Sequence, residues 1–336
     1  MIIVMGDLHL RDDKDFFKLI CLNFLEWFKN WDLNRPGNSL ILAGDLVETA
    51  LLSGTVADYL DKLAMYSKFD NVYICVGNHD VRKVNDSNQL AYEFLKNREN
   101  FHIYEEASNV TIEGKKVLML PYFKGTNFDG KTMGEFYGNL WQDKRFNGHY
   151  DLVVGHFNDD SIMFGGELDI VRNLDKLDAD RILLGHIHTR YIKPEMYIGS
   201  VFANKKGEND SLRAVQILDE NGWREEPLPV FNEFVSVTYP EKLPKPKCQV
   251  PIYTVLNCTS ESIARSKYGN IFIRKVTPNL VDSTNKRRVS IDKGFDSIRS
   301  IDLNEELENF FKSQSVPFDP IIEEECRNLI RNRQVS

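Results

Sequence analysis

The chain lacks the run of about 18 apolar residues that a membrane-spanning helix requires. Its N-terminus shows no basic segment followed by an apolar stretch and a cleavage site, so no secretory leader is expected. The five cysteines show no paired spacing, which predicts reduced thiols and excludes a disulfide framework or a zinc ribbon. We therefore expect a cytoplasmic protein with no membrane attachment.

An excess of basic residues is also absent, because the formal net charge of the 336 residues is −8. Proteins that bind nucleic acid through bulk charge are usually basic. Any contact with DNA must therefore use local basic patches, a metal centre or a partner. The hydrophobic residues, 42% of the chain, suffice for one large domain and a smaller one.

Five apolar, strand-like runs are each followed by a glycine and then by Asp, Asn or His. The runs are residues 2–5, 40–43, 72–76, 152–154 and 181–184. The polar motifs after them are Gly6-Asp7-Leu8-His9, Gly44-Asp45, Gly77-Asn78-His79-Asp80, Gly155-His156 and Gly185-His186-Ile187-His188. Buried strands read as continuous apolar runs, and their ends deliver side chains into one crevice. The series therefore predicts a metal site.

Between these motifs the sequence alternates strand and helix patterns. Helical spacing of apolar residues predicts helices over 15–31, 53–67 and 89–96. Residues 101–120 read as strands joined by a hairpin at Glu113-Gly114. Strands at 196–199 and 212–218 are expected to close a second sheet. For residues 1–230 we predict an α/β fold, a four-layer α/β/β/α sandwich of two packed sheets flanked by helices.

Composition changes after residue 230. Strands at 234–238, 253–256 and 271–276, with a helix at 260–267, predict a small α+β domain over residues 231–281. Residues 282–299 read as a polar linker. Residues 300–336 show two amphipathic helices, whose hairpin would dock on the body of the chain or on a partner's helices.

The ligand types define the predicted site. The candidate ligands are Asp7, His9, Asp45, Asn78, His156, His186 and His188. Nitrogen and oxygen ligands without thiolate suit manganese, iron or zinc better than calcium. His79 lies between two polar neighbours, and the Asp80 carboxylate is expected to orient its imidazole. His102 and His149 lie outside the series and are read as structural.

This set of motifs resembles the calcineurin-like metallophosphoesterase superfamily over about residues 1–200. The resemblance implies two divalent ions, most compatible with Mn²⁺, bridged by Asp45. One ion would take Asp7, His9 and His188, and the other Asn78, His156 and His186. It also implies a metal-bridging hydroxide as nucleophile and His79, with Asp80, as catalytic general acid.

Three further phrases resemble SbcD-type DNA repair nucleases, and the short C-terminal hairpin is most similar to bacteriophage versions. They are Tyr197-Ile198-Gly199-Ser200, Lys206-Gly207-Glu208 and Phe231-Asn232-Glu233-Phe234. The resemblance implies a 3′→5′ exonuclease on duplex ends and an endonuclease on single strands, in the host cytoplasm if the chain is viral. Residues 231–281 would cap the DNA, and 300–336 would bind an SMC-like coiled-coil ATPase. Candidate DNA contacts are Arg82, Lys83, Lys205, Lys206, Lys286, Arg287 and Arg288.

Three points stay open at this stage. Glu48 stands where some relatives have His or Asp, and we interpret it as a helix-entry carboxylate without a catalytic role. A homodimer through the helices at 15–31 and 53–67 is expected, although core packing explains their apolar faces almost as well. Alternative functions are a phosphoesterase for phosphoproteins, cyclic nucleotides or small phosphoesters, and a catalytically inactive adaptor for DNA ends or the ATPase.

Overall fold

A computed structural model describes residues 1–84, 87–123, 125, 130–159, 170–192, 196–209 and 212–277. The chain divides into two units, Met1–Asn279 and Leu280–Ser336. The second unit lies outside the described residues, together with the expected linker, the helical hairpin and Lys286, Arg287 and Arg288. Within the described residues, no helix has the length and apolarity needed to cross a membrane.

The first sheet has six strands in the order β14-β13-β1-β2-β3-β6. They are β1 (Ile2–Met5), β2 (Ser39–Leu42), β3 (Asn71–Cys75), β6 (Phe101–Tyr104), β13 (Ala214–Asp219) and β14 (Gly222–Pro227). Strands β1, β2, β3 and β6 run parallel, whereas β13 pairs antiparallel with β1. The expectation that residues 212–218 belong to the second sheet is therefore wrong. An apolar strand pattern specifies burial but not which sheet receives the strand.

The second sheet also has six strands, in the order β11-β12-β10-β9-β8-β7. They are β7 (Ser108–Ile112), β8 (Lys115–Leu120), β9 (Leu152–His156), β10 (Ile182–Gly185), β11 (Tyr191–Ile192) and β12 (Met196–Tyr197). The predicted hairpin at Glu113-Gly114 is confirmed, because it joins β7 to β8 with both residues at positive φ.

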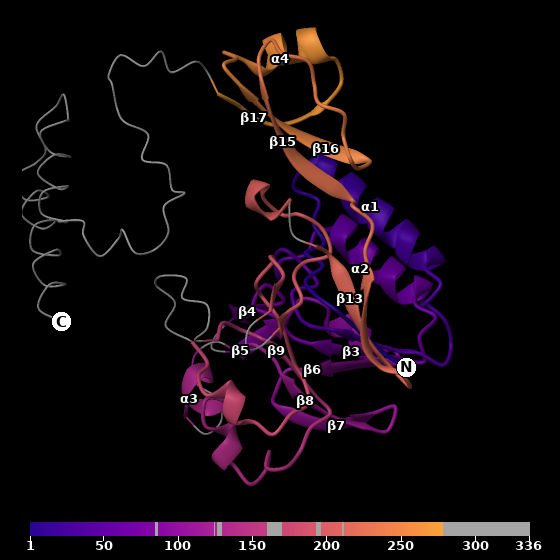
Figure 1. Ribbon diagram of the computed structural model, residues 1–336, viewed down its shortest axis with the longest axis vertical. Helices are drawn as coiled ribbons and strands as arrows, with labels where there is room; N and C mark the ends of the chain where they lie inside the picture. The colour runs from indigo at the N-terminus through magenta and orange to yellow at the C-terminus, as the bar shows by residue number, and fades with distance from the viewer. Residues whose placement is uncertain are drawn as a thin grey trace, which may run out of the picture. The chain divides into compact units, whose positions relative to one another are not determined.

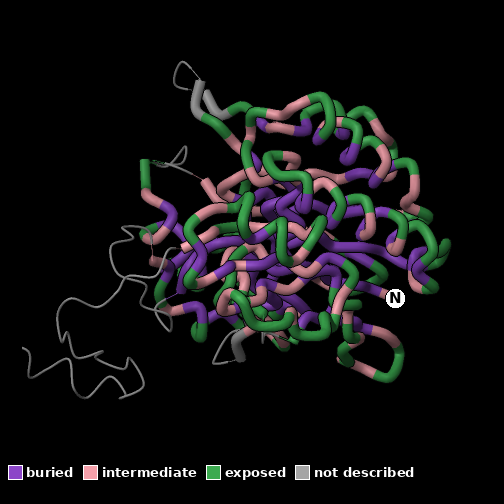
Figure 2. Tube along the Cα trace, turned by 90° about the horizontal axis from the view of Figure 1, so that it is seen from above, coloured by how far each residue is buried: buried purple, intermediate pink, exposed green. Residues whose placement is uncertain are grey.

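Two long helices pack on the first sheet, and both were predicted. Helix α1 (Asp15–Asn30) buries one stripe of aromatic and aliphatic residues, and α2 (Gly54–Tyr66) starts at Ser53, whose hydroxyl accepts from the Val56 N–H. Both helices share a core with the strands of the first sheet. A separate core of aliphatic residues from both sheets includes Val4 and Val154, and Figure 2 shows the buried strands at the centre of the molecule.

The other helical segments are short. They are α3 (Met133–Tyr137), which packs with residues of the second sheet, and 3-10 helices at Glu93–Asn97, Leu140–Gln142, Leu174–Lys176 and Lys206–Glu208. The predicted helix at 89–96 is confirmed only in part, because a 3-10 helix covers Glu93–Asn97 whereas residues 89 and 90 belong to a strand. Strand β4 (Val81–Val84) pairs antiparallel with β5 (Ser87–Leu90), so that Val81 lies opposite Leu90. This cross-strand pairing, which local spacing does not reveal, overrides the helical pattern.

A third sheet follows at the C-terminal side of the first unit (Figure 1). Strands β15 (Asn232–Thr238), β16 (Val250–Leu256) and β17 (Phe272–Thr277) are all parallel, and α4 (Glu261–Tyr268) connects the last two. The predicted strands and helix of this segment are confirmed. Its Phe234, Val250 and Ile252 join the core that contains α1 and α2, and β16 packs against α1. The molecule is thus of mixed α/β class, as predicted.

Candidate metal centre

The polar motifs meet because they follow strands of both sheets. Asp7 and His9 come after β1, Asp45 after β2, and Asn78 with His79 after β3. His156 ends β9, and His186 and His188 follow β10. Asp7, His9, Asp45 and His156 are buried, whereas the other four are half-buried. The ends of five parallel strands therefore deliver eight candidate residues to one place.

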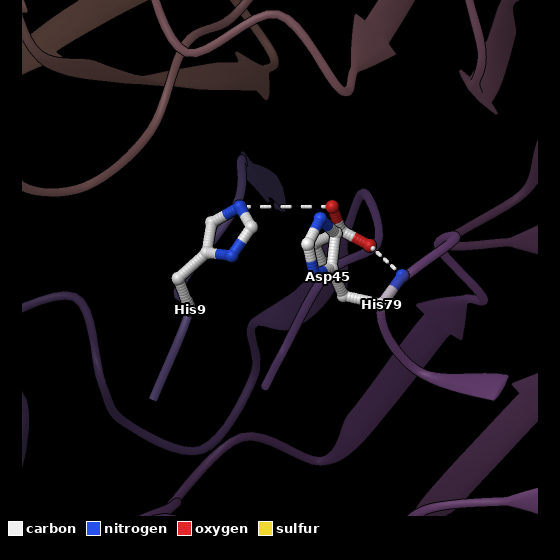
Figure 3. A group of neighbouring side chains, drawn as sticks. All are labelled: His9, Asp45 and His79. Carbon is white, nitrogen blue, oxygen red and sulfur yellow. Dashed lines mark hydrogen bonds and ion pairs between the residues drawn. The ribbon is translucent and has the colours of Figure 1, made fainter. Parts of the chain in front are cut away.

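Asp45 lies at the centre of this cluster (Figure 3). Its Oδ1 accepts a hydrogen bond from the His79 backbone N–H at 2.8 Å. Its Oδ2 lies 3.6 Å from His9 Nε2 and 3.2 Å from His156 Nε2. One carboxylate thus stands between histidines from the two sheets, which is the position that a bridging ligand requires.

Two motif glycines allow this close packing. A Cβ on Gly44 would lie 2.1 Å from His156 Nδ1, and its φ of +89° is strained for other residues. A Cβ on Gly77 would lie 2.2 Å from Asp45 Oδ1. His9, Asp45 and His186 also have positive φ, a strain that proteins retain mostly at functional sites.

One group of ligand atoms matches the set predicted for one ion. The ligand atoms of Asp45, His156 and His186 all lie within 4.8 Å of one another. Asn78 completes the group, because its Oδ1 lies 2.8 Å from His186 Nδ1 and 3.0 Å from His156 Nε2. Carboxylate, amide and two imidazoles converge there.

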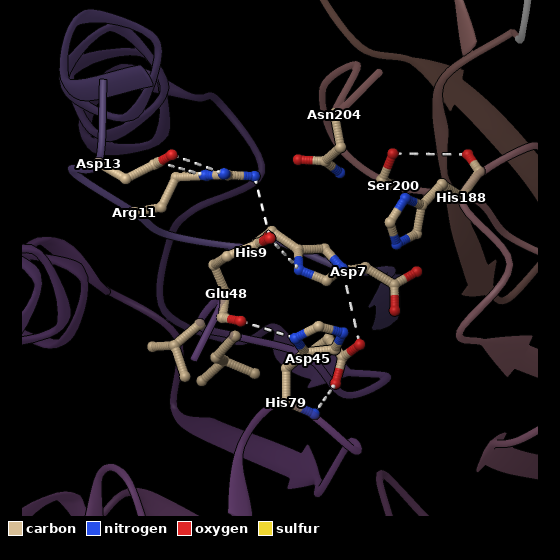
Figure 4. Close-up of polar contacts among 12 residues, drawn as sticks. Asp7, His9, Arg11, Asp13, Asp45, Glu48, His79, His188, Ser200 and Asn204 are labelled. Carbon is tan, nitrogen blue, oxygen red and sulfur yellow. Dashed lines mark hydrogen bonds and ion pairs between the residues drawn. The ribbon is translucent and has the colours of Figure 1, made fainter. Parts of the chain in front are cut away.

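The second group lies on the other side of Asp45. Ligand atoms of His9, Asp45 and His79 lie within 4.8 Å of one another, and the rings of His9 and His188 are 4.5 Å apart. Figure 4 shows Asp7 beside them. Asp7 Oδ2 and His9 Nε2 are buried without a hydrogen bond in the described part of the chain, whereas His9 Nδ1 lies 3.1 Å from the Glu48 carboxylate. Buried polar atoms are normally paired, so these lone pairs fit a cation.

The charges of the cluster agree with this assignment. Burial acts to raise the pKa of Asp45, but the neighbouring His156 and His9 imidazoles hold that pKa below its usual range. Burial acts to lower the pKa of His156, but Asp45 and Asp7 raise it to about 9. For His186, burial and the His156 charge lower the pKa to about 3. In the metal-free protein, His156 therefore keeps a proton where a cation would compete for the same carboxylates.

His79 is held by the backbone and not by Asp80. Its Nδ1 lies 2.6 Å from the Glu48 carbonyl oxygen, to which it must donate because a carbonyl only accepts. The Asp80 carboxylate accepts from the backbone N–H groups of Leu46 and Gly77, both at 2.8 Å. The expectation that Asp80 orients His79 is therefore wrong. Through these two hydrogen bonds, Asp80 links the loop that carries Asp45 to the loop that carries His79.

Two glutamates that the sequence did not identify as site residues also belong to the cluster. Glu48 lies within 3.1 Å of His9 Nδ1, and α2 begins only after Ser53, so its reading as a helix-entry carboxylate is wrong. The buried Glu208 lies 3.1 Å from His188 Nδ1. The available signals were the spacing of Glu48 from Asp45 and the Lys206-Gly207-Glu208 phrase.

The predicted DNA contacts lie around this centre or beyond the described residues. Arg82 is exposed on β4 and donates to the Gln89 side chain. Lys205 and Lys206 are exposed beside Glu208, with Lys205 Nζ 3.8 Å from its Oε1. The side chain of Lys83 lies outside the described atoms.

A family model of calcineurin-like phosphoesterases matches residues 1–190, more than half of the chain. The chain belongs to the calcineurin-like phosphoesterase family. The predicted superfamily is thereby confirmed, and the family's activity is metal-dependent phosphoester hydrolysis. All seven candidate ligands, from Asp7 to His188, lie within the matched residues.

No curated protein matches this phosphoesterase. Among solved structures, 62 chains match, including a protein of unknown function from Aquifex aeolicus. That protein is 18% identical, and the match covers 52% of this chain and 88% of the other, with a TM-score of 0.27.

Proposed function

We propose that the chain is a metal-dependent DNA nuclease of the SbcD type, in which a four-layer sandwich carries the metal centre and residues 231–281 form a capping domain that binds DNA. The single observation that carries DNA as the substrate is the charge of that domain. Residues 231–281 contain seven Lys or Arg and three Asp or Glu, a net charge of +4 within a chain of net −8. A polyanionic substrate explains this segregation better than a small phosphoester does.

The basic side chains of this domain are available for phosphate. All seven are exposed: Lys242, Lys245, Lys247, Arg265, Lys267, Arg274 and Lys275. Only Arg265 has a carboxylate within ion-pair distance among the described residues, namely Glu261. Among the described residues, six of the seven positive charges therefore form no ion pair with a carboxylate.

A short series of contacts links the capping domain to the metal centre. Phe272 of β17 packs on Phe16 with ring centroids 6.2 Å apart, and the next residue, Phe17, lies 4.0 Å under the Arg11 guanidinium. Arg11 Nη1 in turn lies 3.1 Å from Glu48 Oε1, and Glu48 contacts His9. This series fixes the position of β17 relative to the cluster.

In the mechanism we propose, two divalent ions, with Mn²⁺ the most compatible, are held by Asp7, His9, Asp45, Asn78, His156, His186 and His188. Bound ions of this kind acidify water and polarise phosphoryl oxygens. The chain's own contribution to bond cleavage is His79. In the imidazolium form that acts as the acid, Nδ1–H donates to Glu48 O and Nε2 carries the second proton. That proton passes to the leaving 3′ or 5′ oxygen of the phosphodiester.

One assay separates this function from its alternatives. The purified chain is incubated with Mn²⁺, Mg²⁺ or EDTA and three substrates: labelled duplex DNA, labelled single-stranded DNA and a chromogenic phosphodiester. We expect metal-dependent cleavage of DNA and loss of activity in EDTA. Hydrolysis of the small ester alone would support a small-molecule phosphoesterase, and bound metal without hydrolysis would support an inactive adaptor.

The contribution of the capping domain is tested by charge reversal. Lys275 is exposed on β17, and Lys275→Glu should weaken DNA binding and lower the slope of log affinity against log salt by about 1. Lys144→Glu, at an exposed position beyond the capping domain, is the matched control. Hydrolysis of the small ester should stay unchanged in both variants. An equal loss of DNA binding in both would refute a specific role of this domain.

We further propose an SMC-like coiled-coil ATPase as partner, bound by residues 300–336, and a homodimer through α1 and α2. The dimer proposal is supported by three exposed apolar side chains on these helices, Leu19, Leu22 and Met65. Co-purification with the ATPase should be lost when residues 300–336 are deleted. Light scattering that shows only a monomer at micromolar concentration would contradict the dimer.

A further inference from the structure

Two of the candidate ligand histidines share a contact that the others lack. His9 Nδ1 lies 3.1 Å from Glu48 Oε2, and His188 Nδ1 lies 3.1 Å from Glu208 Oε1. The two rings face one another edge to face at 4.5 Å (Figure 4). Each glutamate therefore stands behind one of two adjacent imidazoles, on the Nδ1 side of the ring.

Both glutamates are fixed by further contacts. The second oxygen of Glu48 lies 3.1 Å from Arg11 Nη1. The second oxygen of Glu208 accepts the Asn204 N–H at 2.8 Å, and its backbone oxygen accepts from Arg213 Nη2 at 2.7 Å. Because the second carboxylate oxygen of each glutamate also has a partner, the position of each carboxylate is fixed. Each glutamate therefore restricts the orientation of the imidazole ring that it contacts.

The loop that carries Glu208 is tied to the backbone of His188 as well. Arg213, which is buried, donates through Nη1 to the Ser200 carbonyl oxygen at 2.7 Å. The Ser200 N–H donates to the His188 carbonyl oxygen at 3.0 Å. The ring and the main chain of His188 are thus both set by the segment between Ser200 and Arg213.

The histidines of the other group have uncharged groups as their nearest neighbours at Nδ1, and the closest carboxylate, Asp7 Oδ1, lies 3.5 Å from His156 Nδ1. His156 Nδ1 lies 2.8 Å from the Ala43 carbonyl oxygen, and His186 Nδ1 lies 2.8 Å from Asn78 Oδ1. The centre is therefore asymmetric, because carboxylates from outside the candidate ligand set stand behind the histidines of one group only.

We propose that Glu48 and Glu208 are positioning residues that make one of the two ion sites tighter than the other. Each accepts the Nδ1–H of its histidine, so that the Nε2 lone pair of His9 and of His188 is presented to the same ion. A carboxylate behind a ligand histidine fixes the ring and raises its basicity, and losing one typically weakens metal binding by roughly 10–100-fold. This inference rests on the two-ion assignment proposed above, but not on DNA as the substrate.

The test is Mn²⁺ binding to the full chain, followed by electron paramagnetic resonance and titration calorimetry without any substrate. Glu48→Gln and Glu208→Gln keep an oxygen acceptor and remove the charge, and Glu48→Gln leaves the carbonyl that holds His79. We expect the tighter of two Mn²⁺ sites to weaken about 10–100-fold in each variant, while the weaker site keeps its affinity. Glu26→Gln, on the exposed face of α1, removes the same charge elsewhere and should change neither site.

Thermal unfolding of the metal-free variants separates positioning from simple structural support. Equal weakening of both ions, unchanged affinity at both, or a lower melting temperature with wild-type affinities would each overturn the inference. A wild-type chain that binds only one Mn²⁺ would instead overturn the two-ion assignment, so the two failures are distinguishable.

Discussion

Replacing His79 by glutamine should slow the cleavage of DNA without emptying the metal centre. The interaction of His79 with Asp45 uses the backbone N–H, which the substitution keeps, and Nδ1 is already bonded to the Glu48 carbonyl oxygen at 2.6 Å. What the variant loses is the ring nitrogen Nε2, which can carry a proton and release it. General acid catalysis contributes about 10²–10⁴ in rate, or about 3–5 kcal/mol of the barrier, and we expect a loss of this size on DNA.

The loss should depend on the leaving group. A nitrophenolate leaves without protonation, whereas the alkoxide of deoxyribose needs a proton. Hydrolysis of a p-nitrophenyl phosphodiester should therefore fall by less than about tenfold in the same variant. Initial rates on both substrates, with metal content measured by elemental analysis, test this expectation. His102→Gln is the control, since that histidine lies on β6 and bonds to Asn71, away from the centre.

Two results would refute this role of His79. Equal losses on both substrates would mean that His79 does not protonate the leaving group. Loss of bound metal in the variant would make His79 a ligand instead, a possibility that its place beside His9 and Asp45 makes concrete.

Three further predictions concern stability and metal binding. Gly44→Ala should abolish Mn²⁺ binding and lower the melting temperature, because the added Cβ would lie 2.1 Å from His156 Nδ1 at a φ of +89°. Gln216→Met should raise the free energy of unfolding by about 1–3 kcal/mol in urea titrations, because both amide atoms of this fully buried side chain lack a partner among the described residues. The raised pKa of His156, about 9, favours the folded state below pH 6.5, and this contribution should disappear as the pH rises through 9 in EDTA. His156→Gln should remove that part of the pH dependence.

The strand ends and the polar residues that meet there could be predicted because each motif is local. An apolar run, a glycine and a polar residue are contiguous in sequence, and parallel strands deliver their ends to one edge. The partner of β13 could not be predicted, because either sheet could accept a buried strand. Nor could the hairpin of β4 and β5, since the pairing of Val81 with Leu90 depends on a turn that the helical spacing of 89–96 conceals.

The role of Glu208 was beyond sequence reasoning for a related reason. Twenty residues separate it from His188, and its contact depends on how Arg213 and Ser200 fold the segment between them. Glu48 is close to Asp45 in sequence, yet it contacts His9, which follows a different strand. Local patterns reveal ligands because a ligand needs only a position at a strand end. The residues that contact a ligand from behind depend on which loops lie next to one another, and that arrangement is determined by tertiary packing.

The same distinction applies to the charge of the chain. A net charge of −8 argues against binding of DNA only if the charge is spread evenly over the surface. Phosphate responds to the potential within about one Debye length, roughly 8–10 Å at moderate salt, and not to the sum over the molecule. Because residues 231–281 carry seven basic residues, six of which form no ion pair within the described part of the chain, the acidic remainder does not cancel their local attraction. An acidic protein can therefore bind DNA at a basic domain, with a salt dependence set by the contacts made there.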